Sequence, residues 1–373
     1  MTDVETAIVG GGPAGAAAAC GLAAAGREVM LFERSAGPHH KVCGEFLSIE
    51  TQAHLRQLGI DPPALGAVGV DRVAVYAAGR SIEAALPFRA LSLSRYRLDD
   101  ALLRRAAGYG AQVKRDMAVR QATPAGDGWI LRCDGERVTC RNLVLATGKW
   151  GLRGIGDERD ASFVGLKMHL RLVPHVQRAL SGRVELALLD SGYAGLELVE
   201  DGIANLCLLL PRVLVARLAP GWTALRTYLA GAVPHLTERL DDVEPLWAKP
   251  LAVVCPTGGH LHREEEPGAY RVGDRLAHIP PFTGDGLAIA LASAALAAEH
   301  IARGKPPAAY QLAARRLTAG PIRVASAVSG LAAHGAARAV LMGVVARAPA
   351  LIGSIVRRTR LAADLPSNGR DVS

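Results

Sequence analysis

The sequence has few aromatic residues and no dense basic run. Phe, Trp and Tyr make up 4% of its 373 residues, and a surface that stacks nucleic-acid bases depends on such side chains. The formal net charge is +8, yet the Arg residues are spread along the whole chain. We therefore expect no nucleic-acid partner, and the positive charge fits an anionic small molecule or an acidic membrane surface better.

Paired cysteines and long apolar runs are also missing. None of the six Cys residues forms a Cys-x-x-Cys pair, so we expect reduced thiols, no disulfide framework and no metal site. The longest apolar stretch, residues 339–356, is interrupted by Arg347 and Pro349, which excludes a membrane-spanning helix. The N-terminus lacks a signal-peptide pattern. These absences predict a cytoplasmic protein, with membrane association left open.

The composition that remains is that of a globular protein with about two domains. Half of the residues are hydrophobic and 21% are charged. Strand and helix patterns alternate at the start, residues 160–255 read mainly as an antiparallel meander followed by a helix at 223–240, and residues after 306 read as helical up to a polar tail after Leu365. We predict an α/β fold: a Rossmann-like, doubly wound parallel sheet, a second α+β domain on an antiparallel sheet, and a C-terminal helical segment. The expected divisions are 1–75 with 95–155 and 256–305, then 76–94 with 156–255, then 306–373.

A glycine-rich turn joins the first expected strand to the first expected helix. The segment reads as strand 6–9, the turn, helix 16–25 and strand 28–32 ending at Glu33. In such a unit the glycines make the turn, let backbone N–H groups approach a pyrophosphate and let the helix pack on the sheet. The acid accepts from ribose hydroxyls and repels a 2′-phosphate, so NADP is not expected here. The segment predicts a dinucleotide site formed by Gly10, Gly12, Pro13, Ala14, Gly15, Glu33 and Arg34.

Five segments follow one another as in a known group of flavoenzymes. They are residues 9–33, Lys41-Val42-Cys43-Gly44-Glu45, Ser94-Arg95-Tyr96-Arg97-Leu98-Asp99, Arg271-Val272-Gly273-Asp274 and Pro281-Phe282-Thr283-Gly284-Asp285-Gly286-Leu287. The chain resembles the geranylgeranyl reductase group within the FAD-dependent aromatic-hydroxylase-like superfamily, which also holds flavin monooxygenases and flavin halogenases. The resemblance covers roughly residues 4–305, and the Lys-x-Cys-Gly segment narrows it to this group.

The resemblance implies FAD as the cofactor and gives roles to single residues. Asp274 resembles the acid that binds the ribityl hydroxyls. Arg95 resembles the arginine that reaches over the cofactor, and a solvated charge at a helix entry is the other interpretation. Lys41 and Cys43 lie in the loop that borders the isoalloxazine ring in this group, where Cys43 is either an activated thiol or a plain buried one.

Further cofactor contacts are implied at two strand or helix ends. The N–H groups that open helix 287–301 are expected to stabilise negative charge on the reduced ring, although Asp285 also suits a helix first turn without a catalytic role. The residues concerned are Gly148, Gly284, Asp285, Gly286 and Leu287.

Three departures from the superfamily patterns bear on the reaction. Thr147 stands where hydroxylases carry an Asp, which leaves the electron donor open between NADPH or NADH and a separate reductase. The Trp-x-Trp-x-x-Pro segment of halogenases is absent, so halogenation is not expected. The aromatic Tyr-x-Trp-x-Phe stretch of the reductases is replaced by Tyr193-Ala194-Gly195-Leu196-Glu197.

Together these features predict an FAD-dependent oxidoreductase that acts on a lipophilic, polyketide-like or isoprenoid-like small molecule. Either double-bond reduction or oxygen-dependent hydroxylation fits. Candidates for a catalytic group are Cys43 and His278, and His169 and His260 are further histidines to consider. The alternative is a membrane-peripheral, lipid-binding flavoprotein without turnover, suggested by the basic and apolar C-terminal segment. That segment is otherwise a helical cover on the second domain.

Overall fold

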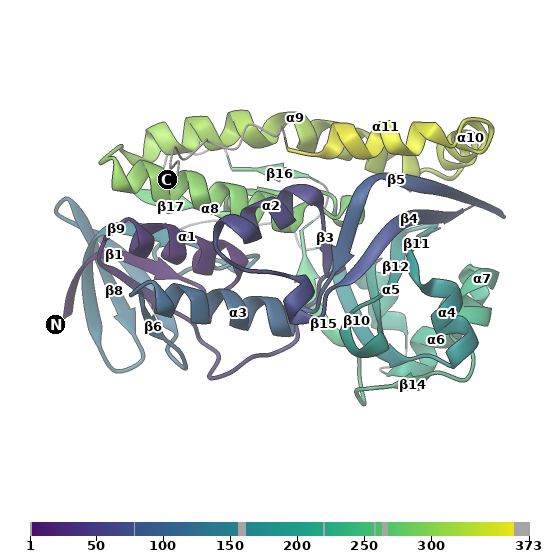
Figure 1. Ribbon diagram of the computed structural model, residues 1–373, viewed down its shortest axis with the longest axis horizontal. Coiled ribbons are helices and arrows are strands. Elements are labelled where there is room, and N and C mark those ends of the chain that lie inside the picture. Colours follow the sequence, from purple (N-terminus) through teal and green to yellow (C-terminus); the bar gives the residue numbers. More distant parts are fainter. Residues whose placement is uncertain are drawn as a thin grey trace.

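A computed structural model describes residues 2–77, 79–155, 162–218, 221–256, 259–262 and 268–361. These residues form two β-sheets with helices packed between and around them, and long C-terminal helices run along the whole molecule (Figure 1). The predicted fold class, with its two kinds of sheet and its C-terminal helical segment, is confirmed. The polar tail expected after Leu365 lies outside the described residues.

The first sheet brings four strand ends to one edge. Its parallel strands are ordered β6 (Gln112–Lys114), β2 (Val29–Phe32), β1 (Thr2–Val9), β9 (Arg137–Leu145) and β17 (Ala269–Arg271), and β8 (Gly128–Cys133) and β7 (Val119–Ala125) extend it antiparallel from β9. Val9 lies level with Phe32 and with Leu145, and Arg271 lies level with Leu145. The segments that follow β1, β2, β9 and β17 therefore meet at the carboxyl edge, where α/β sheets bind ligands.

A layer of small-residue helices covers this sheet. Helix α1 (Pro13–Ala24) packs against α3 (Arg95–Gly108) and α8 (Gly286–Ala302), and Ala16 to Cys20 of α1 are buried. A Cβ on Gly21 would lie 2.9 Å from Cβ of Ala298, so the two helices approach closely. A helix apolar on every face belongs between layers, which is where α1 lies. Helix α2 (Ile49–Gln57) packs on α8 as well.

The second sheet has nine strands. Their order is β14 (Glu244–Pro245), β10 (Phe163–Arg171), β13 (Ile203–Pro211), β12 (Gly192–Leu198), β11 (Gly182–Leu189), β4 (Val68–Ala77), β5 (Arg80–Ser92) and β3 (Phe46–Leu47), with β15 (Leu251–Cys255) also paired to β10. Only the pair β11–β4 is parallel among these described strands. Because β3 and β4 belong to this sheet, the expected first segment 1–75 crosses from one sheet to the other and its boundary needs correction.

One face of the second sheet is covered by short helices. They are α4 (Pro174–Leu180), α5 (Arg212–Arg217), α6 (Trp222–Ala232) and α7 (Pro234–Arg239), and α4, α6 and α7 contribute buried leucines and valines to one core with β10, β12 and β13. The single helix expected over 223–240 is two helices. Pro234 opens α7, because proline lacks the N–H that a continuous helix needs and fits a first turn.

Two of the C-terminal helices cover the other face of this sheet: α10 (Gly335–Arg347) and α11 (Ala350–Thr359) lie across β4 and β5 (Figure 1). The helix before them, α9 (Pro307–Ala333), packs on α8 and β17. Among the described helices, none alone has the length and hydropathy to cross a membrane, and only α9 and α10 taken together, bent by 110°, meet those criteria. Small elements complete the fold: the β16–β18 pair (His260–Leu261 with Ala277–His278) and the 3-10 turns η1 (Pro63–Leu65), η2 (Glu200–Gly202), η3 (Gly273–Arg275) and η4 (Pro281–Thr283).

Candidate cofactor and substrate site

The glycine turn after β1 has no room for side chains. Gly10 has φ +110°, and a Cβ there would lie 2.3 Å from the carbonyl oxygen of Ala146. A Cβ on Gly15 would lie 1.9 Å from the carbonyl oxygen of Gly10. Gly12 is the N-cap residue of α1, and its side-chain-free position leaves the helix N-terminus uncapped by any side chain. Pro13 and Ala14 open the helix, so the turn presents backbone N–H groups suited to phosphate oxygens.

The acid after β2 closes over this turn. Glu33 is buried, its Oε2 accepts from the backbone N–H of Gly11 at 2.8 Å, and its Oε1 accepts from that of Ser35 at 2.9 Å. Burial alone would raise the pKa of Glu33, but the charge of Lys41 and these N–H groups hold it below its usual value. The ionised carboxylate keeps further lone pairs for ribose hydroxyls. Arg34, beside it, is exposed.

Arg95 lies over the turn and is held there. Its Nη2 is 3.7 Å from the place a Cβ on Gly12 would take. Its Nε and Nη2 donate to the two carboxylate oxygens of Asp99 at 2.6 and 2.8 Å, and Lys41 Nζ lies 3.0 Å from the same carboxylate. Although Asp99 is buried, Arg95 and Lys41 lower its pKa. The result is a fixed pair of cations beside the uncapped helix.

Two motifs far apart in the sequence meet at this edge. Gly273, with φ +58°, lies so close to α1 that a Cβ on it would be 2.9 Å from Cβ of Ala14. Asp274 follows it in η3, and His278 Nδ1 lies 3.8 Å from Asp274 Oδ1. Burial opposes ionisation of Asp274, yet His278, Lys149 and Arg95 lower its pKa strongly.

Lys149 is a residue of this edge that sequence reasoning did not select. It follows Gly148, whose φ is +66° in the turn after β9. Its Nζ donates to Cys255 Sγ at 3.1 Å, and the charge of Asp274 raises the pKa of Lys149 against the effect of burial. The sequence offered one signal for this residue: a Lys directly after Thr147-Gly148, where the strand pattern ends.

At the start of α8, the carboxylate of Asp285 pairs with an arginine of another helix, and the expected contact of the loop N–H groups with a flavin stays a prediction. Gly284 has φ +73°, and a Cβ on it would lie 2.7 Å from the Phe46 ring. Asp285 is the N-cap residue of α8, but its carboxylate is fully buried and forms an ion pair with Arg360 at the end of α11. Burial raises the pKa of Asp285 to about 7, with Arg360 acting against the rise. Gly286 and Leu287 then begin the helix, exposed and buried respectively.

The loop from β2 to β3 places a buried ion network beside Cys43. Glu45, with φ +63°, is fully buried and is contacted by Lys167 Nζ and, at 3.0 Å, by His169 Nε2. Its Oε1 also accepts from the backbone N–H of Arg95 at 2.8 Å. The thiol of Cys43 accepts from the Glu45 N–H at 3.4 Å. Lys167 and His169 keep the pKa of Glu45 below its usual value despite burial.

This network includes atoms that suit a metal ion. Ligand atoms of His40, Glu45 and His169 lie within 4.8 Å of one another. The ammonium of Lys167 already contacts the same carboxylate, and burial together with His169 and Lys167 lowers the pKa of His40 to about 4. The charge of Lys167 disfavours a divalent cation at this carboxylate by repulsion. The cluster therefore reads as a polar network, and the absence of a metal stays a prediction.

The three histidines considered in the sequence analysis have different surroundings. His278 is 6% exposed and lies beside Asp274. His169 belongs to the Glu45 network, and His260 pairs through its backbone with His278 between β16 and β18. Hence His278 lies beside Asp274, and His169 contacts Glu45, whose N–H group donates to the Cys43 thiol.

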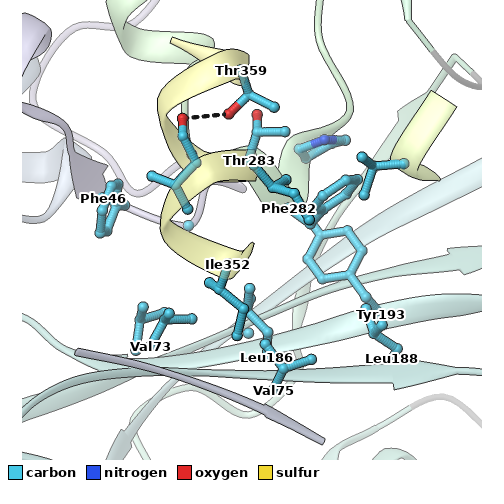
Figure 2. A pocket seen from close by; sticks show the side chains of 18 of the residues that line it. Phe46, Val73, Val75, Leu186, Leu188, Tyr193, Phe282, Thr283, Ile352 and Thr359 are labelled. Carbon is cyan, nitrogen blue, oxygen red and sulfur yellow. Dashed lines mark hydrogen bonds between the residues drawn. The ribbon is translucent and has the colours of Figure 1, made fainter. Parts of the chain in front are cut away.

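An apolar cavity of about 190 Å³ begins at this edge. Side chains of β4 and β11 form its floor, α11 crosses above it, and Tyr193 and Phe282 close one side (Figure 2). Its walls also include two loop glycines, Gly44 and Gly284, which ties it to the expected ring-binding loops. Further lining residues are mostly aliphatic: Val73, Val75, Leu86, Val184, Leu186, Leu188, Leu341, Met342, Val345, Ile352, Ile355 and Val356.

Comparison with known proteins identifies the cofactor domain and similar enzymes. Residues 3–154 match the family described as the FAD binding domain. Menaquinone reductase of Mycobacterium tuberculosis is 26% identical over 315 residues, which cover 79% of this chain and 76% of that protein. Digeranylgeranylglycerophospholipid reductase 2 of Methanopyrus kandleri is 27% identical over 319 residues, with 80% of this chain and 76% of that protein covered.

Solved structures share the whole fold. The flavin-dependent brominase Bmp2 superimposes with a TM-score of 0.80 at 19% identity, covering 96% of this chain and 93% of that one. The myxobacterial chondrochloren halogenase CndH gives a TM-score of 0.70 at 20% identity, with coverages of 85% and 79%. At these identities the likeness shows only that this chain has the same fold as these two proteins.

Proposed function

We propose that this chain, an FAD-dependent oxidoreductase of the geranylgeranyl reductase-like group, reduces a carbon–carbon double bond in a lipophilic, isoprenoid-like molecule. The observation that carries this proposal is the aliphatic cavity that has Gly44 and Gly284 in its walls and lies under α11 (Figure 2). A cavity with such walls selects a hydrocarbon chain, because each buried methylene contributes about 0.8 kcal/mol. It also excludes water from the reacting end.

The residues of the sheet edge fit an FAD molecule. We assign the glycine turn and the N-terminus of α1 to the pyrophosphate, Glu33 to the ribose and Asp274 to the ribityl chain. Arg95 is fixed by Asp99 at 2.6 Å, beside the position where phosphate charge would lie. When bound and reduced, the flavin supplies the hydride that such a reduction needs. The chain's part is to bind and orient the substrate and to keep the reacting end dry.

We also assign the C-terminal helices a contact with the cytoplasmic surface of a membrane. Val340 and Val344 of α10 are 67% and 49% exposed, and Leu351 of α11 is 40% exposed. Arg357 and Arg358 are exposed on the last turns of α11. Apolar side chains next to exposed arginines suit an interface with acidic lipids. Other residues of the same two helices line the cavity, so a lipid has a short path from a bilayer to the site.

The first experiment separates reduction from hydroxylation. The purified protein is loaded with FAD, reduced with dithionite without oxygen, and mixed with a polyprenyl alcohol, whose carbon–carbon double bonds are its only reducible groups. We expect the product to gain two hydrogens, measured by mass spectrometry, and the flavin to reoxidise at the same rate. A product that gains one oxygen when air is admitted would contradict the proposal. NADPH, NADH or an added reductase then replaces dithionite to identify the donor.

A cavity variant tests whether the cavity is the substrate site. Leu186→Trp should fill it and lower the rate of substrate-dependent reoxidation at least tenfold while flavin absorbance is retained. The matched control is Val213→Trp on α5, where the native side chain is 64% exposed and lies away from the cavity. Equal rates in the two variants would place the substrate elsewhere.

A further inference from the structure

One acid lies inside the apolar cavity. Among the described residues that line it, Glu197 and Arg360 are the charged ones. Arg360 is already engaged by Asp285 and lies over the rings of Phe46 and Phe88. Glu197 is 3% exposed and has no basic partner in an ion pair that the structure describes. Burial of a carboxyl group without a basic partner costs free energy, so packing alone does not explain why Glu197 lies in this cavity.

The alternation of β12 points Glu197 toward the cavity. Tyr193, Gly195 and Glu197 line it on one face of the strand. Leu196 also borders the cavity, but by the strand alternation its side chain lies on the other face with that of Leu198, and both belong to the core there. This is the stretch where the sequence departs from the aromatic pattern of the reductases. The acid therefore stands on the cavity wall itself.

Glu197 also lies at the cofactor end of the cavity. Its Oε2 accepts from Ser92 Oγ at 2.6 Å, and Ser92 pairs with Phe46 in the β5–β3 ladder. On β13, its register partner is Asn205, whose amide donates to the carbonyl oxygens of Cys43 and Gly44 at 3.2 and 3.0 Å. Both neighbours, Ser92 and Asn205, contact the Cys43–Phe46 segment, which the resemblance places next to the ring.

The surroundings keep this acid neutral. Burial raises the pKa of Glu197 to about 8; the nearby charge of Glu45 adds to the rise, while Ser92 and Lys167 act against it. Other ionisable groups on neighbouring elements are His169, which contacts Glu45, and the Asp285–Arg360 pair across the cavity. Cys207 and Tyr193 also line the cavity, and burial raises the pKa of both, that of Cys207 to about 12. Near neutral pH, Glu197 is therefore a carboxylic acid, which can donate one hydrogen bond.

We propose that Glu197 donates a hydrogen bond to a carbonyl oxygen of the substrate, so the cavity takes a lipid with a carbonyl beside its double bond in preference to a bare hydrocarbon. This inference rests on the proposed function, since it assumes that the cavity holds the substrate. A carbonyl oxygen requires only a donor, and the hydroxyls of Thr283 and Thr359 already donate to backbone carbonyls at 3.0 Å. The Tyr193 hydroxyl is a further donor in the lining, but burial raises its pKa well above the usual value, so a pH-dependent preference would report Glu197. Glu197 is thus a specificity-determining residue.

Equilibrium binding to the oxidised, FAD-loaded protein tests the inference without turnover. The probes are a long-chain α,β-unsaturated ketone and the alkene of the same chain length, followed by calorimetry. At about pH 6 we expect the ketone to bind about tenfold more tightly, the effect of one hydrogen bond. At about pH 9.5, above the pKa of about 8, this preference should disappear because the ionised carboxylate has no proton to donate.

Two variants complete the test. Glu197→Gln keeps an N–H donor that does not titrate, so the preference for the ketone should persist at both pH values. Glu197→Leu should bind the alkene as well as the wild type does and lose the preference. An infrared band of a protonated carboxyl should vanish in Glu197→Gln and remain in the control Glu244→Gln, whose side chain is 67% exposed on β14.

The outcomes distinguish the two proposals. Equal binding of ketone and alkene to the wild type at about pH 6, or an unchanged preference in Glu197→Leu, would overturn the role of Glu197 and leave the cavity as the lipid site. Failure of the wild type to bind either probe would overturn the proposed function, and with it this inference. If Glu197→Leu does not fold, the pH dependence and Glu197→Gln still decide.

Discussion

At the scale of single residues, the turn after β1 can form only because glycines, which have no side chain, occupy its crowded positions. Gly10 and Gly15 each face a backbone carbonyl at a distance that no Cβ tolerates. The charged residues near the turn depend on their neighbours as well. Glu33 and Asp99 are buried, and the N–H groups and cations around them keep their pKa values below the usual range. A turn of this kind suits a ligand with phosphates, which is the role that we propose for it.

Gly15→Ala should therefore remove FAD. Its Cβ would lie 1.9 Å from the Gly10 carbonyl oxygen, so the turn must open and the N–H groups lose their alignment. We expect the purified variant to retain less than about a tenth of the flavin, measured by absorbance, and to unfold at lower urea concentration. Gly37→Ala is the control, since nothing lies within 4 Å of its Cβ position. A yellow Gly15→Ala protein would contradict the assignment.

At the scale of elements, α11 is fastened to the start of α8. Arg360 ends α11 and pairs with the buried Asp285, while Ile352 of the same helix points into the cavity (Figure 2). The Arg357 and Arg358 side chains on the last turn are exposed instead. One buried ion pair thus holds the roof of the cavity to the cofactor loop.

Arg360→Met should loosen this roof in a pH-dependent manner. The pKa of Asp285 is about 7 with Arg360 present, so below that value the carboxyl is protonated and the loss of its partner costs little. As pH rises past about 7, the wild type gains the ion pair and the variant does not. We expect the deficit in unfolding free energy to grow to about 3 kcal/mol, measured by urea unfolding.

Hydrogen exchange provides the second measurement for this variant. Amides of α11 should exchange faster in Arg360→Met than in the control Arg357→Met, whose native side chain is exposed. An unfolding deficit that is the same at about pH 5.5 and about pH 8.5 would contradict the ion-pair explanation and indicate lost packing on Phe88 instead.

At the scale of the whole molecule, α10 and α11 each have one face toward the cavity and one face toward the outside. Their inner residues line the cavity and their outer residues Val340, Val344 and Leu351 are exposed. The helices lie over the second sheet, at the opposite end of the molecule from the N-terminus (Figure 1). In the proposed function, cofactor binding and lipid entry are thus separated along the longest axis, and the cavity joins them.

The double variant Val340→Ser/Val344→Ser should weaken binding to vesicles rich in phosphatidylglycerol about tenfold, because two apolar side chains leave the interface. Co-sedimentation measures it, and added salt should weaken the wild type as well. Val213→Ser on α5, equally exposed but on another part of the surface, should bind as the wild type does. Equal binding of all three proteins would contradict a membrane contact through α10.

Much of the cofactor domain could be predicted because its signals are local. The run of glycines, the small-residue helix and the acid after β2 lie within the first 33 residues, and their order alone indicates a dinucleotide fold. FAD dependence and the oxidoreductase class, both predicted from the motifs, are confirmed by the matched domain and the similar reductases. The role of each site residue stays a prediction.

The tertiary structure decided which distant groups meet. Lys167 and Glu45 are 122 residues apart, and Arg360 and Asp285 are 75 apart. No local spacing connects such pairs, so the sequence showed only isolated charges. The same holds for β4, whose alternation predicts a strand but not the sheet it joins. The pKa of Glu197 is likewise set by the tertiary structure, because burial and the charge of Glu45, a residue distant in the sequence, raise it.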